Sequence, residues 1–483
     1  MKKFQKVVAM LLCIGMMASL LTACGGATEK TAGDGEMANI KWYISSAQPQ
    51  GFDEVMVEAN KYLGEKYNMQ LDLQCIESGD YESKMQLALA SGEEFDLIWT
   101  SNWKFDYESN AAKGAFLELD DMLKNDVPEL YEYYSEGIWG AATVGDKIYG
   151  VPMEQVLYNQ KGIQFKKSYL DKYGFTDYYN QVNGWEDLEE IYDVIAEGEK
   201  GDPTFAITTS TQKDYFIPEV TQITGDYTVG ATFIVDGKVT DRAEEYDDYR
   251  RRMRVWNQKG YFPAGIATAE TDNIVTLGGY TRYLPGCEGK AAISAKEPVI
   301  AIPTTEPFLG RNGVQSTLTA VSATSSDPVA ALKLLHIMHT DEYMLNLICY
   351  GIEGRDYTKD PENPKRMDRE SGSYYIAEFM IGSQFLAYLV PTYEDGVWEE
   401  TKAGNEAATV DPNIEFSFDP KDVESQISQV AAVAAEYKTI FEYGLMDAEI
   451  AISEYNEKIN KAGFKEVQTE IQRQYDAWLA EQE

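Results

Sequence analysis

The sequence predicts an α/β fold with a helical C-terminal region. Apolar residues recur at helical spacing over 52–67, whereas apolar and polar residues alternate over 69–75, as they do in a half-buried strand. Apolar runs predict two more strands, at 40–44 and 95–99, and a second helix is predicted over 81–90. Strands and helices that alternate in this way form a parallel sheet with right-handed crossovers, and ligands bind such a sheet beyond the carboxyl ends of its strands.

Helices are also predicted further along the chain. One is predicted over 185–196, and apolar stripes predict three more over 423–441, 450–459 and 467–478. Another helix-like stretch, 247–257, is basic, and we expect its arginines to pair with neighbouring acids. The arginines are Arg250, Arg251, Arg252 and Arg254, and the acids include Glu244, Glu245 and Asp247.

The chain is long and strongly acidic. Its 483 residues are enough for two or three domains with substantial cores. Its net charge of −38 should repel nucleic acid and anionic membranes, so neither is expected as a partner. The charge also weighs against an anionic ligand, although a pocket can be locally positive.

The N-terminus has the pattern of a signal peptide. Lys2, Lys3 and Lys6 precede an apolar run over 7–21 that is too short for a stable membrane span. Small and polar residues without periodicity follow over 27–38 and predict a flexible tether. No later segment approaches the length of a membrane helix, so we expect everything after the tether to lie outside the cell.

Residues 21–24, Leu-Thr-Ala-Cys, resemble the lipobox of bacterial lipoproteins. The resemblance implies acylation of Cys24, which would hold the protein at the extracellular face of the cytoplasmic membrane, as in Gram-positive bacteria. An ordinary signal peptide with an incidental cysteine is the alternative. The cysteines after Cys24 are odd in number and scattered, so no disulfide framework is expected. They are Cys75, Cys287 and Cys349.

Four segments resemble, in their order, those of extracellular solute-binding lipoproteins of ABC importers, above all the carbohydrate-type family 1. The most telling is 139–152, which resembles the hairpin that ends the first lobe in that family, although here Asp146 stands between its glycine and its lysine. The other three are 114–120, 289–293 and 325–328.

The chain also resembles a narrower subgroup of Gram-positive lipoproteins that carry an uncharacterised conserved C-terminal domain. Segments 350–357 and 382–385 and the C-terminal residues carry this resemblance. It implies a two-lobed periplasmic-binding-protein-like fold with a multi-strand hinge that closes on a ligand. The implied boundaries are a signal peptide over 1–23, a lipidated tether over 24–38, a first lobe over 39–152 and 308–350, and a second lobe over 153–307 and 351–483 with the helical C-terminal region.

Polar and aromatic residues near the strand ends and the hinge are the candidate ligand-binding residues. Carbohydrate recognition needs aromatic faces for the sugar rings and planar polar side chains for pairs of hydroxyls. Structural roles compete with binding at Trp103 (packing), Glu154 (a hinge ion pair) and Trp398 (anchoring a helix start). The candidates are Ser46, Gln48, Tyr81, Asn102, Trp103, Glu154, Gln155, Tyr283 and Trp398.

No constellation of catalytic residues stands out. The histidines, His336 and His339, are expected on a helix surface, without the further ligands of a zinc protease. No nucleophile elbow or phosphate-binding loop occurs, and with 80 acidic residues a carboxylate pair can always be drawn. We therefore expect no enzyme activity, no cofactor and no catalytic metal. A structural calcium site in an acidic loop such as 360–368 stays open.

Together the resemblance and the candidate residues predict a protein that captures an oligosaccharide and delivers it to ABC permease subunits. A monomer is expected, because both lobes must move and then dock on the permease. The alternatives are a peptide or another solute as the ligand, a surface sensor or adhesin with a protein partner, and a surface glycoside-active enzyme.

Overall fold

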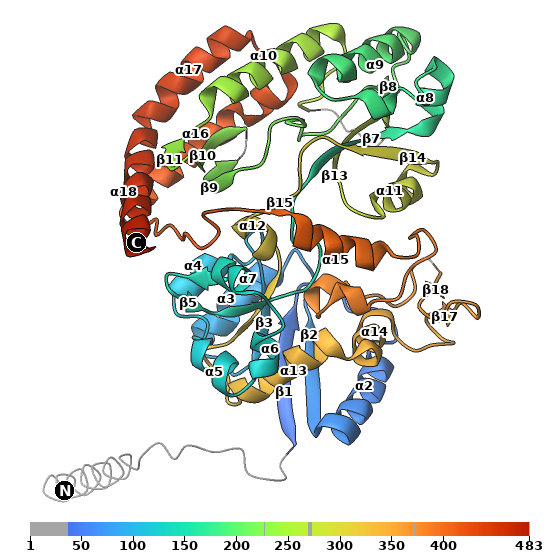
Figure 1. Cartoon of the computed structure of the whole chain (residues 1–483), viewed down its shortest axis with the longest axis vertical. Helices are drawn as coiled ribbons and strands as arrows, with labels where there is room; N and C mark the ends of the chain where they lie inside the picture. Colours follow the sequence, from blue (N-terminus) through green and yellow to red (C-terminus); the bar gives the residue numbers. More distant parts are fainter. Residues whose placement is uncertain (1–36, 227, 269–272, 371, 483) are drawn as a thin grey trace, which may run out of the picture. The chain divides into compact units, whose positions relative to one another are not determined.

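The computed structural model describes residues 37–226, 228–268, 273–370 and 372–482, and Asn39–Glu483 form one compact unit. One part of this unit is built on a five-stranded sheet in the order β2-β1-β3-β16-β6 (Figure 1). Trp42 in β1 and Trp99 in β3 are fully buried, so the middle of this sheet lies in a core. The five strands are β1 (Ala38–Ile44), β2 (Met69–Cys75), β3 (Leu97–Thr100), β6 (Gly150–Pro152) and β16 (Leu318–Val321).

This sheet is mixed rather than parallel throughout. β1 and β3 run parallel, with Trp42 opposite Leu97, as the alternation of strands and helices predicts. β16 comes from a much later part of the chain and runs antiparallel to both β3 and β6. The carboxyl ends of β1 and β3 nevertheless lie at one edge of the sheet, and the loops after them carry Ser46 and Trp103.

The two helices predicted here, over 52–67 and 81–90, are present with bounds that differ by at most one residue, and further helices surround the sheet. Asp327 and Asp341 are the N-caps of two of these further helices, and the carboxylate of each accepts a hydrogen bond from a backbone N–H of the first turn. The long helices of this part are α2 (Phe52–Tyr67), α3 (Tyr81–Ser91), α13 (Pro328–Thr340) and α14 (Glu342–Tyr350). The short ones are α4 (Tyr107–Ala112), α5 (Asp120–Asn125), α6 (Pro128–Tyr131), α7 (Glu136–Ala141) and α12 (Arg311–Val314).

The two histidines on α13 differ from the prediction of a helix surface. His339 is buried, with Nδ1 2.7 Å from the Leu335 carbonyl and Nε2 3.2 Å from the Pro152 carbonyl. Burial lowers the pKa of His339. His336 is half-buried. The surface prediction is therefore wrong for His339, because β6 covers this face of α13 and only the tertiary structure brings the two together.

The segment 139–152 forms the hairpin that its resemblance implies. β4 (Thr143–Val144) pairs antiparallel with β5 (Lys147–Ile148), and β6 follows directly. Gly145 lies in the turn with a φ of 65°, a left-handed conformation that glycine adopts at no steric cost. From β6 the chain continues into the second part of the unit.

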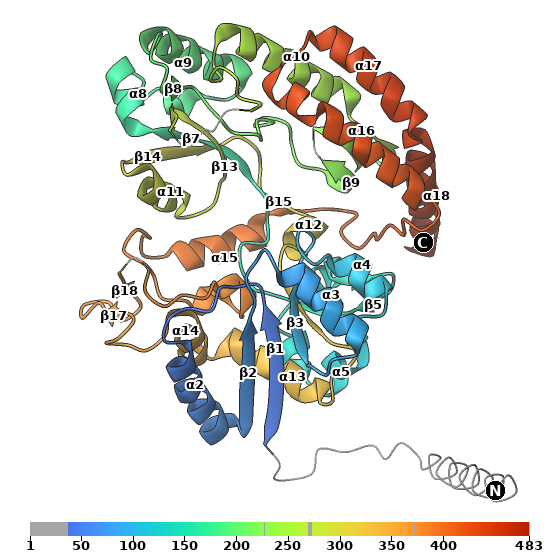
Figure 2. The ribbon, with the colours of Figure 1, turned by 180° about the vertical axis from the view of Figure 1, so that it is seen from behind.

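The second part contains two three-stranded antiparallel sheets, in the orders β13-β7-β14 and β11-β10-β9 (Figure 2). Its strands are β7 (Lys161–Lys166), β8 (Phe205–Ala206), β9 (Thr221–Asp226), β10 (Val229–Val235), β11 (Lys238–Thr240), β12 (Val275–Thr276), β13 (Gly278–Arg282) and β14 (Val299–Pro303). Its helices are α8 (Lys167–Tyr173), η1 (Tyr179–Gln181), α9 (Trp185–Gly198), α10 (Ala243–Lys259) and α11 (Cys287–Ala295). A large aromatic core, with Tyr192, Tyr215 and Trp256, joins them.

The C-terminal helices pack on this second part. Buried side chains of α16 and α17 enclose Val229 of β10, and those of α18 enclose Ile234 of the same strand. Figures 1 and 2 both show these helices beside α10 and the β9–β11 sheet. The three helices are α16 (Glu424–Tyr443), α17 (Ala448–Lys461) and α18 (Phe464–Gln482). The prediction of a helical C-terminal region is confirmed.

Arg250, Arg251 and Arg252 of the basic stretch of α10 pair with acids, as predicted, whereas Arg254 donates to the Gly444 carbonyl at 3.0 Å. Arg250 forms an ion pair with Asp247 at 2.6 Å. Arg251 pairs with Asp248, and Arg252 pairs with Glu189 of α9. The first two pairs lie within α10, whereas Arg252 and the bond from Arg251 to Glu449 join α10 to other helices.

Short strands connect the two parts. Asn159 bridges to Phe308 in antiparallel fashion, and β15 (Phe308–Leu309) pairs in parallel with β19 (Thr409–Val410). The chain thus passes between the two parts several times, and the crossing segments are hydrogen-bonded to one another. This arrangement agrees with the predicted two-lobed α/β fold with a multi-strand hinge.

Residues 351–407 bond to the first sheet and its helices. Arg355 donates to the Gly51 carbonyl at 3.2 Å, Thr317 Oγ1 donates to the Phe379 carbonyl at 2.7 Å, and Asn346 donates to the Leu386 carbonyl. The assignment of 351–483 to the second lobe stays a prediction, and these bonds favour placing 351–407 with the first. The segment contains β17 (Thr358–Lys359), β18 (Met367–Asp368), η2 (Glu378–Met380), η3 (Gln384–Leu386) and α15 (Val397–Ala407).

The predicted signal peptide, tether and Cys24 lie outside the described residues. Among the residues that are described, no helix has both the length and the apolar character needed to cross a membrane. Cys75, Cys287 and Cys349 are free thiols. Cys349 is buried, as its apolar surroundings in the sequence predict, and burial raises the pKa of the half-buried Cys75 thiol to about 12.

Candidate ligand-binding site

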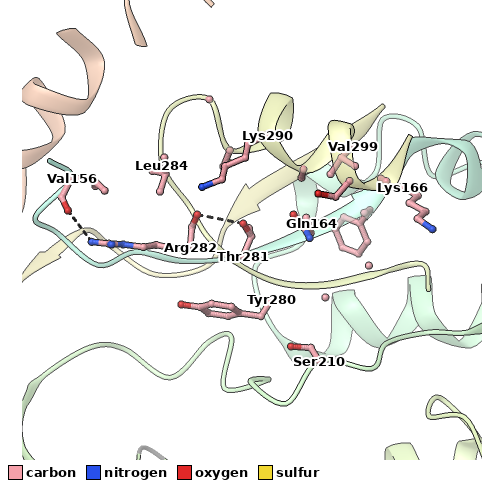
Figure 3. Close-up of a pocket in the computed structure, with 18 of the residues that line it drawn as sticks. Val156, Gln164, Lys166, Ser210, Tyr280, Thr281, Arg282, Leu284, Lys290 and Val299 are labelled. Carbon is pink, nitrogen blue, oxygen red and sulfur yellow. Dashed lines mark hydrogen bonds between the residues drawn. The ribbon is translucent and has the colours of Figure 1, made fainter. Parts of the chain in front are cut away.

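A cavity of about 770 Å³ lies where the second part faces residues 379–401 (Figure 3). One wall is formed by β7, β13 and α11 with the loop that carries Thr209 and Ser210. The opposite wall is formed by Phe379, Gln384, Tyr393 and Trp398, and Gln155 borders the cavity where the chain leaves β6. We call these the strand wall and the aromatic wall.

Glycines allow the strand wall to form. β13 pairs antiparallel with β7, with Tyr280 opposite Ile163. A Cβ at Gly278 would lie 1.8 Å from the Gln164 carbonyl oxygen, and one at Gly279 would lie 2.9 Å from Thr208 Oγ1. Only glycine therefore permits the close packing of β13 on β7 and on the 208–210 loop.

The polar groups of the strand wall are held in place by the backbone. Arg282 donates to the carbonyls of Val156 and Tyr158, so its guanidinium lies against the chain that leaves β6 (Figure 3). Ser210 Oγ donates to the Gln212 carbonyl at 2.7 Å. Burial raises the pKa of Tyr280, so its phenol is neutral and can both donate and accept hydrogen bonds.

The aromatic wall is a packed cluster. Trp398 meets Tyr393 edge to face at 5.4 Å between ring centroids and lies 6.3 Å from Phe385. Its indole Nε1 donates to the Ala387 carbonyl at 2.8 Å, which fixes the orientation of the ring. Trp398 is the second residue of α15, so it occupies a helix start and borders the cavity at the same time.

Three predicted residues gather around residues 312–316, and of these three Gln155 lines the cavity. Gln155 Nε2 donates to Ser316 Oγ at 2.9 Å, and Trp103 Nε1 donates to the Ser316 carbonyl at 2.8 Å. Asn102 donates to the Asn312 carbonyl at 3.0 Å. Trp103 is 59% exposed and leans on Trp99, so its outer face is open to solvent.

Glu154 is held by hydroxyl groups. Tyr133 and Ser383 each donate a short hydrogen bond to its Oε2. Burial, together with the charge of Glu154, raises the pKa of Tyr133, so the phenol keeps the proton that it donates. Ser383 belongs to 351–407, so Glu154 ties this segment to the end of β6 rather than forming the hinge ion pair considered from the sequence.

The other four candidates lie elsewhere, and like Asn102, Trp103 and Glu154 they do not line the cavity. Tyr81 is fully buried, and its hydroxyl donates to the Trp99 carbonyl at 2.6 Å, so it packs in the core. Ser46 donates to the Ala47 carbonyl, and the exposed Gln48 borders a separate hollow beside α2 and β2. Tyr283 is half-buried at the end of β13.

Sequence reasoning missed most of the cavity. Phe379, Gln384, Tyr393 and Tyr280 carry no local motif, although the pair Gly278-Gly279 before Tyr280 marks a close backbone approach. Another signal was the predicted family segment 289–293. A Cβ at Gly289 would lie 2.1 Å from the Thr392 carbonyl oxygen, so this glycine allows α11 to touch the aromatic wall.

Metal binding finds no support in the described part of the chain. No three or more His, Cys, Asp or Glu side chains there gather in a way that could hold a metal ion. In the acidic loop 360–368, Asp360 Oδ1 accepts hydrogen bonds from the backbone N–H groups of Glu362 and Asn363.

Comparisons with known proteins agree with this architecture. The sequence profile of bacterial extracellular solute-binding proteins matches residues 44–345, and that of a domain of unknown function (DUF3502) matches residues 412–480. A carbohydrate ABC transporter substrate-binding protein of Streptococcus pneumoniae serotype 4 is 29% identical over 506 residues, which cover 99% of each chain.

Solved structures give the same result. The N-glycan transport solute-binding protein NgtS of Streptococcus pneumoniae is 26% identical with a TM-score of 0.79, over 92% of this chain and 100% of that one. Its complex with Man1GlcNAc is 25% identical with a TM-score of 0.72 over the same shares of the two chains. The chain therefore belongs to the family of bacterial extracellular solute-binding proteins, and it is a binding protein rather than an enzyme.

Proposed function

We propose that this protein captures an oligosaccharide in the cavity between the strand wall and the aromatic wall. The main observation behind this proposal is that a packed aromatic surface faces a wall of hydrogen-bonding groups across the cavity. Aromatic rings pack on the apolar faces of sugars, and Gln155, Gln384 and Tyr280 can bond to hydroxyls. The cavity volume of about 770 Å³ is within the range of about 300–1,000 Å³ that is usual for small-molecule sites.

The relatives support this choice of ligand. The Streptococcus pneumoniae relative is described as a carbohydrate substrate-binding protein. NgtS was solved with Man1GlcNAc and with Man5GlcNAc, and both ligands are oligosaccharides. Because these chains match almost the full length of this one, a peptide is the weaker alternative.

We further propose that the lobes close on the ligand around residues 159, 308–309 and 409–410. On this view the first lobe consists of 39–152, 308–350 and the segment 351–407, which is bonded to it. The second lobe consists of 153–307 and the C-terminal region. Closure would enclose the sugar between the two walls, which already touch where Gly289 meets Thr392, and the closed monomer would then dock on ABC permease subunits.

A lipid anchor would keep this protein beside its permease. We propose that Cys24 is acylated and that residues 1–23 are cleaved. One acyl chain gives only marginal membrane binding, whereas several give stable anchoring. Cells that express the natural chain should incorporate an alkyne fatty acid into it, and Cys24→Ala should abolish the label. Labelling of the Cys24→Ala variant would contradict this assignment.

Ligand binding can be tested with purified residues 37–483, which contain the whole compact unit. Thermal shifts would be recorded with neutral glycans, acidic glycans, peptides and amino acids. A ligand that binds only the folded state raises the melting temperature, by several degrees when present at about a hundred times its Kd. Shifts with glycans alone are expected. A shift with peptides alone would overturn the carbohydrate assignment.

A further inference from the structure

The charges around the cavity are opposite to those of the chain as a whole. The chain has 80 acidic and 42 basic residues. Among the described residues that line the cavity, however, the charged ones are Lys166, Arg282 and Lys290, and none is Asp or Glu. All three belong to the strand wall or to α11, whereas the aromatic wall carries no charge.

Two of these cations form no ion pair with a carboxylate in the described part of the chain. Within the described residues, neither Lys166 nor Lys290 has a carboxylate within 4.0 Å, although many other lysines of this chain do. Arg282 adds a third positive charge and is fixed by the Val156 and Tyr158 carbonyls. Figure 3 shows Lys290 reaching toward the end of the cavity where Arg282 lies, and Lys166 at the other end.

Local charge can outweigh the net charge of the protein. At physiological ionic strength, charges further away than about 8 Å are largely screened. A ligand inside the cavity therefore interacts most strongly with the cations that line it, although Glu288 and Glu378, which act on the lining residues Cys287 and Tyr393, weaken that field. Ammonium and guanidinium groups also form the stronger, charge-assisted hydrogen bonds with anionic oxygens.

We propose that the ligand is an acidic oligosaccharide, whose anionic group lies at the Lys290 end of the cavity while its sugar rings pack on Tyr393 and Trp398. This inference rests on the proposed function and specifies its ligand. A carboxylate, as in a sialic or uronic acid, and a sulfate ester share the required chemistry.

The test compares three matched glycans by isothermal titration calorimetry. They are an N-acetyllactosamine-terminated oligosaccharide, the same glycan with a terminal sialic acid, and the same glycan with a sulfate ester. At least one acidic form should bind about tenfold or more tightly than the neutral form, and the preference should shrink at high salt. The two acidic arms distinguish a carboxylate from a sulfate.

Variants then locate the anion. Lys290→Gln should bring the ratio of acidic to neutral affinity down toward one. Lys61→Gln makes the same change of charge on the exposed face of α2 and should leave the preference intact. Equal or tighter binding of the neutral glycan would overturn this inference alone. Failure of all three glycans to bind, with binding of peptides, would overturn the proposed function as well.

A second observation concerns the C-terminal region. Tyr443, at the end of α16, donates to the Thr209 carbonyl at 3.1 Å, and Thr209 lines the cavity. Lys213 lies 4.4 Å from the centroid of the Tyr443 ring and donates to the Ser210 and Thr211 carbonyls. A Cβ at Gly444 would lie 2.3 Å from the Met253 carbonyl oxygen, so glycine allows the end of α16 to reach this place.

We infer that one task of the C-terminal region is to hold the 208–213 loop in the strand wall, with Tyr443 as the positioning residue. Hydrogen exchange of the ligand-free chain tests this. Tyr443→Leu should speed amide exchange across 208–213 at least tenfold, and Tyr443→Phe, which keeps the ring over Lys213, should have a smaller effect. Tyr437→Leu, from the same helix, should leave the loop unchanged. Equal exchange at the loop in all these variants would overturn the inference, whatever their melting temperatures.

Discussion

The two walls contribute different chemistry to the same cavity. The aromatic wall, on the proposed first lobe, supplies uncharged rings, those of Phe379, Tyr393 and Trp398, and the strand wall, on the proposed second lobe, supplies Lys290 and Arg282. A ring face binds sugars whatever their charge, whereas a cation distinguishes ligands by charge. The comparison indicates that affinity depends mainly on the first lobe and selectivity mainly on the second.

The lobes also differ in the charged groups that they bury. In the first, Asp341 accepts hydrogen bonds from Tyr62, Lys66 and Tyr67. In the second, Lys213 is fully buried beside Phe262 and Tyr443. The free energy of unfolding depends on pH in opposite ways for a buried carboxylate with donors and for a buried ammonium with few acceptors. The pH dependence of stability therefore distinguishes the contributions of the two lobes.

The largest expected effect is on stability in the first lobe. Asp341→Ala removes an N-cap and a buried, charge-assisted network, so the free energy of unfolding should fall by about 3 kcal/mol. Urea unfolding at pH 7 measures this. Asp53→Asn, in the exposed first turn of α2, is the matched control. A loss below about 1 kcal/mol would mean that the network is replaced by water.

Lowering the pH should remove the stabilisation that the Asp341 carboxylate provides. Burial by itself raises the pKa of Asp341, but the bonds from Lys66, Tyr67 and Tyr62 hold it at about 2. The folded pKa thus lies below the unfolded value of about 3.9. The stabilisation is complete above that value and is lost as the pH falls toward 2. The difference in stability between the natural chain and Asp341→Ala should narrow between pH 4 and pH 2.

The next largest effect is on ligand affinity. Trp398→Ala should weaken the binding of neutral and acidic glycans alike, by about 30-fold or about 2 kcal/mol, since a central aromatic anchor is lost. Calorimetric titration measures both. Trp478→Ala, a half-buried tryptophan of α18, should leave affinity unchanged. If Trp398→Ala lost affinity for acidic glycans only, the aromatic wall would determine selectivity as well, which would contradict the comparison above.

A smaller effect is expected where the two walls touch. Gly289→Ala would place a methyl group 2.1 Å from the Thr392 carbonyl oxygen, so α11 and the aromatic wall must separate. Overpacking of this kind costs about 1–3 kcal/mol, and we expect glycan affinity to fall about tenfold. Gly137→Ala in α7, where a Cβ meets nothing within 4 Å, is the control. Unchanged affinity would show that the contact plays no part in binding.

The smallest effect concerns Lys213 and pH. Burial lowers the pKa of Lys213 to about 7, although Glu442 and Asp214 oppose this. Between pH 7 and its unfolded pKa of about 10.4, the unfolded chain binds more protons, so stability should rise with pH by about 1 kcal/mol per unit. Chemical unfolding between pH 7 and 9 should show this rise, and Lys213→Met should flatten it. An equal slope in the variant would assign the rise to other groups.

Local sequence patterns determined much of the fold. The predicted helices at 52–67 and 81–90 differ from α2 and α3 by at most one residue, and the strand at 69–75 agrees with β2. Periodicity suffices here because each element buries one face, which fixes the spacing of its apolar residues. The family motifs are local as well, and the profile match over 44–345 bears out their resemblance to solute-binding proteins.

The site was decided by the tertiary structure. Of the candidates, Gln155 and Trp398 border the cavity, whereas Tyr81 follows a strand in the sequence but turns its ring into the core. Tyr280 and Tyr393 are far apart in the chain. They border the same cavity because the strand wall meets the aromatic wall where Gly289 lies against Thr392. Periodicity records which face of an element is buried, but not which element covers it, so long-range packing alone could assemble these walls.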